Sequence, residues 1–160
     1  MSLPPDYATE CLYDPTHAFV HEVRRLDESA VLAVVDTTRL GALVDAQRAM
    51  VGHPKHVPGA VMVQITGTLG NLHAVYALGL RISEGWVGFG THLRSARFPS
   101  LGRIGPPMET ELRVTRVRRL RGRVFVEYAF TYTQDDRRVY ESEQTAVWVR
   151  GPDAEASIGA

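Results

Sequence analysis

The sequence predicts an α+β fold in which one strongly curved antiparallel sheet wraps around a single long helix. Residues 60–78 are apolar on every side, which is typical of a helix surrounded by protein and not of a surface helix. Residues 112–149 alternate apolar and polar side chains in runs separated by turn signals, which is typical of antiparallel strands. One helix cannot cover two sheets, so we expect one curved sheet.

The chain before the long helix predicts a hairpin and a short helix. Residues 18–25 and the β-branched apolar run 29–36 are the two expected strands. Thr38 is the expected N-cap of the short helix. The apolar face of that helix is expected to consist of Leu40, Leu43, Val44 and Val51.

After the long helix the sequence predicts only strands. Residues 86–95 form the first, and Gly88 and Gly90 within it indicate a bulge or close backbone packing. Further strands begin at Leu112, span 124–132 and span 139–149, with turns at 120–122 and 134–136. We expect residues 1–12 to be an extended lead-in, 13–150 a single domain and 151–160 a flexible tail.

Composition excludes several classes of protein. The 160 residues carry 18 basic and 18 acidic side chains, and this zero net charge argues against a nucleic-acid binder. The single cysteine, Cys11, permits no intramolecular disulfide. The first residues show no basic segment followed by an apolar one, so we expect no signal peptide and a cytoplasmic location. Gln64, Asn71 and His73 interrupt the apolar segment, which favours burial in protein over a membrane span.

The stretch from His53 to Gly59 is the candidate centre of function. Pro58 disfavours helix at the residue before it, and Gly59 permits close approach of the backbone. A helix that begins there presents free amides and the positive end of its dipole to one spot. His53 and His56 lie just upstream, but no nearby Cys, Asp or Glu completes a metal site with them. We therefore predict neither a metal nor a cofactor.

The order of elements, with Pro-Gly opening the helix, resembles the hot-dog fold. Several stretches are similar to segments of 3-hydroxyacyl-thioester (acyl-carrier-protein) dehydratases. Residues 17–23 resemble their first strand, and Gly52-His53-Pro54 resembles their Gly-His-Phe-Pro motif. Residues 57–63 resemble their Met-Pro-Gly helix start, and 93–98 resemble their strand that ends in Arg-Phe. His53-Pro54-Lys55-His56-Val57-Pro58-Gly59 also resembles, more loosely, the hot-dog domain of A-factor synthases, with Lys55 where those have Asp.

This resemblance implies a set of site residues. The family uses a histidine of one subunit and a carboxylate on the central helix of its partner, and the carboxylate position is Gln64 here. An amide can orient water or a carbonyl, but it does not transfer a proton near neutral pH. The implied acid/base group is His56 or His53, and Gln64 would orient the substrate. Gly59 and Ala60 would polarise the thioester carbonyl, and Arg97 and Phe98 would contact substrate.

The implied ligand is an acyl thioester of coenzyme A or acyl carrier protein, in fatty-acid or polyketide metabolism. The implied reaction is dehydratase-like; the alternatives are a thioesterase and a non-catalytic binding module that lacks the carboxylate. The implied assembly is a homodimer or a dimer of dimers.

A hairpin at 113–123 adds six arginines within eleven residues. They indicate either a phosphate contact or, with more weight, a solvated hairpin that blunts an edge strand. The hairpin lacks the stacking aromatics of a nucleic-acid site.

Overall fold

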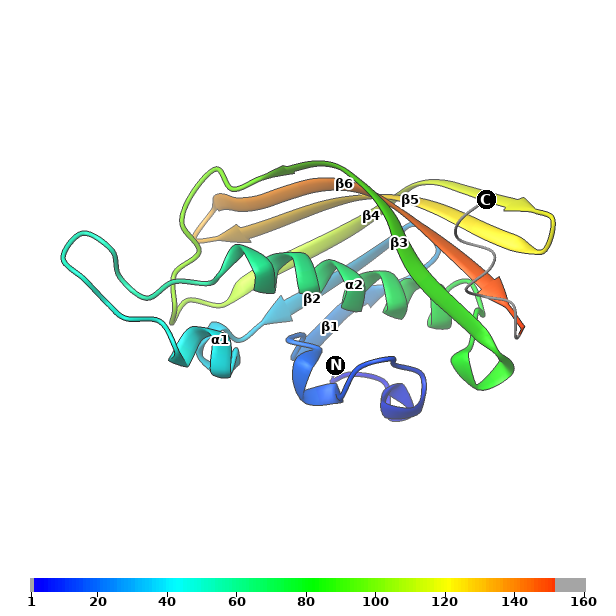
Figure 1. Ribbon diagram of the computed structural model, residues 1–160, viewed down its shortest axis with the longest axis horizontal. Coiled ribbons are helices and arrows are strands. Elements are labelled where there is room, and N and C mark those ends of the chain that lie inside the picture. The colour runs from blue at the N-terminus through cyan, green and yellow to red at the C-terminus, as the bar shows by residue number, and fades with distance from the viewer. Residues whose placement is uncertain (1, 152–160) are drawn as a thin grey trace.

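The computed structural model describes residues 2–151, so the predicted tail lies outside the described residues except for its first position. Six antiparallel strands form one sheet in the order β1-β2-β4-β5-β6-β3, and the sheet curves around one long helix, α2 (Figure 1). The predicted α+β class is confirmed. The strands are β1 (Glu22–Leu26), β2 (Ala30–Val35), β3 (Trp86–Arg97), β4 (Met108–Leu120), β5 (Arg123–Gln134) and β6 (Arg137–Arg150). Two α-helices, α1 (Ala42–Asp45) and α2 (Gly59–Tyr76), and four single 3-10 turns complete the described elements.

Helix α2 supplies the centre of the core. Its side chains at Val61, Ile65, Leu69 and Leu72 are fully buried against the concave face of the sheet. Pro58 is the N-cap of the helix and is extended, with φ −62° and ψ 143°, so the helix begins at Gly59 as the sequence predicts. Within residues 2–151, no helix is long and apolar enough to cross a membrane.

One stripe of α2 is left uncovered within the chain, which differs from the expectation of a helix wrapped on all sides. The sheet covers the helix from one direction only, and the residues that face away from it stay accessible. This stripe consists of the exposed or half-buried residues Ala60, Val63, Gln64, Gly67 and Asn71.

The predicted strands and turns are confirmed in the second half of the chain. Every second side chain of β5 is buried, from Val124 to Tyr132. Arg121 and Gly122 both have positive φ, at 49° and 74°, and so do Asp135 and Asp136. Two consecutive residues with positive φ twist a hairpin in the sense that its strands require.

Gly88 confirms the prediction of close packing on β3. A Cβ added at this position would lie 2.6 Å from the Trp148 ring of the paired strand β6. The register of β3 against β6 shifts between Gly90 and His92, where the sequence predicts a bulge. Glycine at 88 therefore lets the largest side chain of β6 lie flat across β3.

The short helix differs from its prediction. Thr38 lies inside a 3-10 turn, Thr37–Arg39, that Asp36 caps: the Asp36 side-chain oxygen accepts hydrogen bonds from the Thr38 amide at 3.0 Å and from the Thr38 hydroxyl at 2.6 Å. Helix α1 follows this turn and is only four residues long. Val51 is fully exposed and does not share a face with Val44, because residues 46–56 leave the body of the protein as a projecting loop, which we call the arm (Figure 1).

His73 is a structural histidine in the core. Its Nε2 lies 3.1 Å from the Glu28 carbonyl oxygen, and its Nδ1 lies 3.1 Å from the Tyr128 hydroxyl. A carbonyl only accepts, so Nε2 carries the proton and Nδ1 accepts from Tyr128. Burial lowers the pKa of His73, because a charged imidazole would have to leave water.

We expect the free energy of unfolding to decrease as the pH falls below about 6.5, because the unfolded chain then binds a proton at residue 73 that the folded chain resists. The loss from this residue is at most about 1.4 kcal/mol per pH unit. His73→Gln should be less stable at pH 7.5 but should lose less stability on acidification. Urea unfolding at pH 7.5 and 5.5 measures both effects.

His92→Gln is the matched control, because His92 is exposed on β3. Its unfolding free energy should follow the wild-type pH dependence. A His73→Gln protein with the full wild-type pH dependence would contradict the assignment.

Candidate functional site

The start of α2 presents two unused amides. The amides of Val61 and Met62 donate to the Pro58 carbonyl at 3.0 and 3.2 Å, but no acceptor for the Gly59 and Ala60 amides is found within residues 2–151. These donors lie at the positive end of an 18-residue helix. They form a place where a carbonyl oxygen with partial negative charge is stabilised.

Phe98 lies against this helix start. A Cβ added at Gly59 would sit 3.0 Å from the Phe98 ring, so only glycine lets the ring approach this closely. Phe98 is half exposed, and its other neighbour is Tyr140 of β6, with ring centroids 5.3 Å apart. The structure thus brings Phe98 to Gly59, two residues predicted to contact substrate. Arg97 is exposed and lies 3.7 Å from the Glu141 carboxylate.

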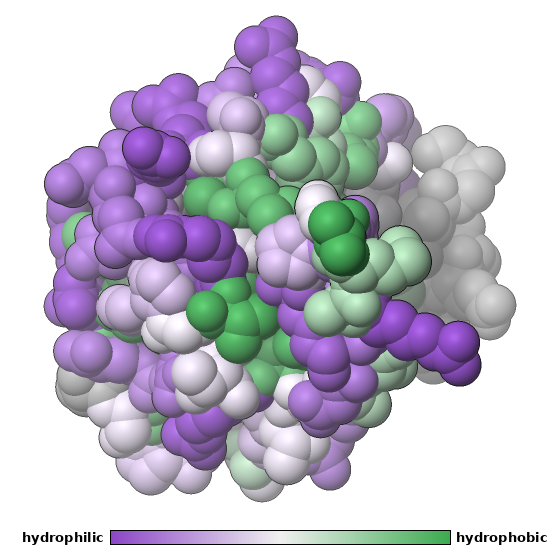
Figure 2. Space-filling view, turned by 90° about the vertical axis from the view of Figure 1, so that its left-hand side faces the viewer, coloured by the Kyte–Doolittle hydropathy of each residue, from purple (hydrophilic) through white to green (hydrophobic). Residues whose placement is uncertain are grey.

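The two candidate histidines lie on the arm. Their rings are 5.1 Å apart at 78°, with His53 exposed and His56 half buried at the base of the arm. His56 Nδ1 donates to the Pro54 carbonyl at 3.2 Å, which leaves Nε2 as the nitrogen able to accept a proton. The Gln47 side chain holds the His56 backbone through two hydrogen bonds, at 2.7 and 3.2 Å. Figure 2 faces this end of the molecule and shows apolar surface set among polar surface.

Gln64 lies on the uncovered stripe of α2 and is half buried. Within the described residues, no hydrogen bond joins it to either histidine. The arm extends away from α2 (Figure 1), so a single chain does not assemble the histidines and Gln64 into one site.

A cavity of about 170 Å³ lies along the second half of α2, between the helix and strands β3, β5 and β6. The N-terminal segment, residues 2–17, forms its remaining wall through Tyr7, Cys11 and Tyr13. An apolar cavity of about 150 Å³ holds a benzene molecule, so this one admits a group of roughly six heavy atoms. None of the residues predicted for the site lines it.

Three residues that line this cavity each carry a fully buried polar atom without a hydrogen-bond partner among residues 2–151: Tyr7 Oη, Asn71 Oδ1 and Trp148 Nε1. Trp148 faces the Tyr128 hydroxyl, and Tyr7 faces the Cys11 thiol and Thr68, but none of these pairs reaches hydrogen-bond geometry. Each unpaired buried group costs about 1–3 kcal/mol. Burial raises the pKa of Tyr7, so its hydroxyl is a neutral donor.

The uncovered stripe leads from the helix start into the cavity. Residues seven apart on a helix face nearly the same direction, so Gln64 and Asn71 lie on one face about 10 Å apart. The first half of the stripe is open, and the N-terminal segment covers only the second half. The result is a surface path that begins at Gly59 and ends in a partly open pocket.

Gln144 of β6 joins the two ends of this path. Its Oε1 accepts from the Thr66 hydroxyl of α2 at 3.2 Å, and its Nε2 donates to Ser142 Oγ at 3.0 Å. Gln144 lines the cavity. Tyr140, four residues earlier on the same strand, packs on Phe98 at the helix start.

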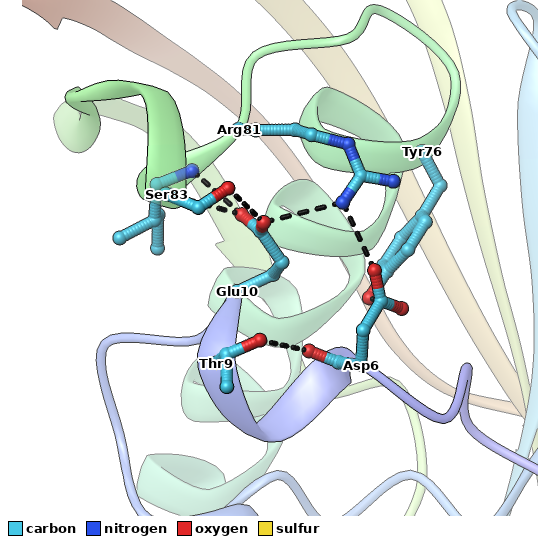
Figure 3. A network of polar contacts seen from close by, with 7 residues as sticks. Asp6, Thr9, Glu10, Tyr76, Arg81 and Ser83 are labelled. Atoms are coloured by element: carbon cyan, nitrogen blue, oxygen red, sulfur yellow. Dashed lines mark hydrogen bonds and ion pairs between the residues drawn. The ribbon is translucent and has the colours of Figure 1, made fainter.

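A polar cluster fixes the N-terminal segment over α2 (Figure 3). Glu10 is almost fully buried, and its carboxylate accepts from the Ile82 amide at 2.7 Å, the Ser83 amide at 3.3 Å and the Ser83 hydroxyl. Arg81 Nη1 donates to both Glu10, at 3.2 Å, and Asp6, at 2.9 Å. Burial acts to raise the pKa of Glu10, but the bonds from Ser83, Ile82 and Arg81 outweigh it and hold that pKa below its usual value.

Solved structures with similar folds were found, although no protein-family model matches the chain and a search of curated proteins by sequence finds no match. The dehydratase heterocomplex ApeI:P from Xenorhabdus doucetiae is 11% identical, with a TM-score of 0.69 over 98% of this chain and 97% of that chain. A mutant thioesterase from Pseudomonas aeruginosa is 16% identical, with a TM-score of 0.56 over 82% of each chain. A hypothetical thioesterase with coenzyme A from Streptococcus pneumoniae is 14% identical, with a TM-score of 0.53 over 81% of this chain and 85% of that chain.

These matches, the sheet order and the central helix show that the chain has the hot-dog fold, as its motifs predict. At such identities they establish the fold alone. Within residues 2–151, no group of three or more His, Cys, Asp or Glu side chains is arranged to hold a metal ion. The arginines of the β4–β5 hairpin are exposed except for the half-buried Arg123.

We expect Glu10→Gln to lower the free energy of unfolding by about 1–3 kcal/mol at pH 7, because an amide nitrogen cannot accept from Ile82 or Ser83. Since the pKa of Glu10 is lowered in the folded chain, its contribution is present at neutral pH and is lost as the pH falls through the folded-state value. Urea unfolding at pH 7 and pH 4 should show the wild type and the variant converging. Glu143→Gln, an exposed carboxylate on β6, should change neither value; equal effects of the two substitutions would contradict this role of Glu10.

Proposed function

We propose that this protein binds an acyl thioester of coenzyme A or acyl carrier protein, with the thioester carbonyl at the start of α2. The observation that carries the proposal is the pair of unused amides at Gly59 and Ala60, at the head of a surface path that ends in an apolar cavity. A thioester carbonyl gains negative charge when its α-proton is removed or when water attacks it. Two amides at a helix start stabilise that charge.

The available groups limit the reaction. Dehydration of a 3-hydroxyacyl thioester requires a group that protonates the leaving hydroxyl, and Gln64 has no titratable proton. His56 or His53 would be the acid/base group, with Nε2 of His56 free for the task. Hydrolysis requires an oriented water, which an amide side chain can hold; as the C–O bond forms and the C–S bond breaks, the proton of the water passes to a histidine or to the leaving thiolate. A dehydratase-like reaction with His56 or His53 as the acid/base group is the first candidate, and a thioesterase or a binding module without catalysis are the alternatives.

The assembly we propose is a homodimer formed through β3. This 12-residue strand lies at the edge of the sheet and, among residues 2–151, pairs only with β6. A long edge strand that is open on one side is a template for pairing with another chain. A twofold axis at β3 would continue the sheet across both subunits and place the uncovered stripe of α2 near the partner. The arm of one subunit would then supply its histidines to Gln64 of the other.

We expect sedimentation equilibrium at micromolar concentration to give twice the mass of the 17.7 kDa chain. Leu93→Pro should shift the equilibrium toward the monomer, because Leu93 is half exposed on β3 and proline cannot donate to a pairing strand. Val117→Pro is the control, because it introduces a proline at an exposed position in the second half of β4, away from β3. A wild-type chain that sediments as a monomer would contradict the proposal.

We expect the wild-type protein to dehydrate 3-hydroxyacyl-coenzyme A weakly or not at all, and Gln64→Glu to introduce or raise that activity. Glutamate is nearly isosteric with glutamine and provides the missing proton donor once its pKa is raised beside apolar side chains. Mass spectrometry of 3-hydroxyacyl and saturated acyl thioesters separates dehydration, release of free thiol, and binding without reaction.

Gln64→Leu is the control, since it changes the same position without adding a proton donor. Robust wild-type dehydration that survives replacement of both His53 and His56 would overturn the assignment of these residues. A modest loss of stability should accompany Gln64→Glu, because a carboxylate there is half buried.

A further inference from the structure

The tip of the β4–β5 hairpin and the first residue of β3 enclose an open hollow of about 310 Å³, which we call the basic notch. It is lined by Trp86 and by residues 119–124, which include Arg119, Arg121 and Arg123. The hairpin tip projects from the end of the molecule opposite to the arm (Figure 1). The candidate site at the start of α2 therefore uses none of these residues within one chain.

The positive charge of the basic notch is not compensated within residues 2–151. No carboxylate lines the notch. Of the six arginines in the hairpin, only Arg113 and Arg118 have a carboxylate at ion-pair distance, at 3.9 and 3.8 Å. The three arginines of the notch are thus like charges without partners, an arrangement that repels itself and attracts an anion.

Trp86 adds a donor on the same side of the sheet. Its indole nitrogen finds no acceptor among residues 2–151, yet, unlike that of Trp148, it is not sealed from solvent. Trp86 pairs with Arg150, two residues from the buried Trp148, so it lies on the helix side of the sheet. Arg119 pairs with the buried Val124 and therefore lies on the same side.

The side chains of the notch define the chemistry of its ligand. Guanidinium and indole groups donate hydrogen bonds and accept none, so the ligand must supply negative charge and several acceptor oxygens. Phosphate supplies both, and the fork of an arginine binds two of its oxygens. The indole face beside these arginines is a surface on which a purine base stacks. A hairpin that only blunts an edge strand requires charge along that edge, but it gives no role to an accessible indole.

We propose that the basic notch binds the phosphates of the coenzyme A nucleotide, so that coenzyme A, and not a carrier protein, delivers the acyl group. The inference rests on the proposed function, which leaves both carriers open, and on the dimer through β3. A twofold axis there pairs β3 with its copy in antiparallel fashion, so the start of one strand lies near the end of the other. Phe98 follows the end of β3 and lies against Gly59. The notch of one subunit therefore lies at the end of the dimer where the surface path of the other subunit begins.

The test compares two analogues with the same acyl chain, in which a methylene separates the sulfur from the carbonyl so that no reaction consumes them. One carries complete coenzyme A, and the other carries only pantetheine, which has no phosphate. Isothermal titration calorimetry with the full-length protein should show about tenfold tighter binding of the coenzyme A analogue. Adenosine 3′,5′-bisphosphate, which has no acyl chain, should compete with the coenzyme A analogue but not with the pantetheine analogue.

Arg119→Ala and Arg121→Ala should each weaken binding of the coenzyme A analogue about tenfold, because each removes a charged donor to phosphate. Both should leave binding of the pantetheine analogue unchanged, which a misfolded variant would not do. Arg116→Ala is the matched control. Arg116 is an exposed arginine of the same strand, but it pairs with Glu127 on the opposite face of the sheet and does not line the notch. This control should leave the ratio of the two affinities at its wild-type value.

The outcomes separate this inference from the proposed function. Equal affinity of the two analogues would overturn the inference and leave acyl-thioester binding in place. Absence of binding by both analogues would overturn the proposed function and the inference with it. An effect of Arg116→Ala as large as that of Arg119→Ala would overturn the assignment to the notch. An acyl carrier protein whose binding depends on Arg119, while that of the coenzyme A analogue does not, would show that the notch docks a carrier protein and would also overturn the inference.

Discussion

The structure depends on the burial of one helix that has almost no polar face. Most of the side chains of α2 are apolar, so the helix must be enclosed, and a single sheet of six strands does this by curving around it. The curvature requires long strands with strong twist. The positive φ values of the two hairpin turns match that twist. A single sheet still approaches the helix from one direction, and the stripe from Ala60 to Asn71 is what remains.

The uncovered stripe is where the features of the candidate site meet. At one end are two amides without acceptors, and at the other a cavity lined by three residues whose buried polar atoms have no partners among residues 2–151. In a folded protein such groups are usually satisfied internally, since each one left unpaired when buried is destabilising. The free amides and the cavity lie toward opposite ends of one face of α2, which is the arrangement that an extended ligand requires.

The N-terminal segment converts half of the stripe into a pocket. Glu10 is buried, which is unfavourable for a carboxylate, yet four donors compensate for the lost water and hold the segment in place. The residues that line the cavity from this segment therefore have fixed positions. These bonds anchor a short stretch whose regular structure consists of the 3-10 turns Tyr7–Thr9 and Pro15–His17.

The sequence by itself determined the features that follow from local periodicity and backbone chemistry. The alternation of β5 and the start of α2 at Pro58 are predictable because each depends on neighbouring residues. Close packing at Gly88 is also predictable, because a glycine within a strand indicates it, but its partner Trp148 is known only from the structure. Asn71 was noticed as a polar residue within the helix, but no local signal marked Tyr7 or Trp148 as partners in one cavity. The apolar pattern predicts Val51 on a helix face, whereas the chain leaves the body of the protein at that residue. Only the tertiary structure brings together residues 7, 71 and 148, because such contacts are set by how the sheet closes over the helix and not by spacing along the chain.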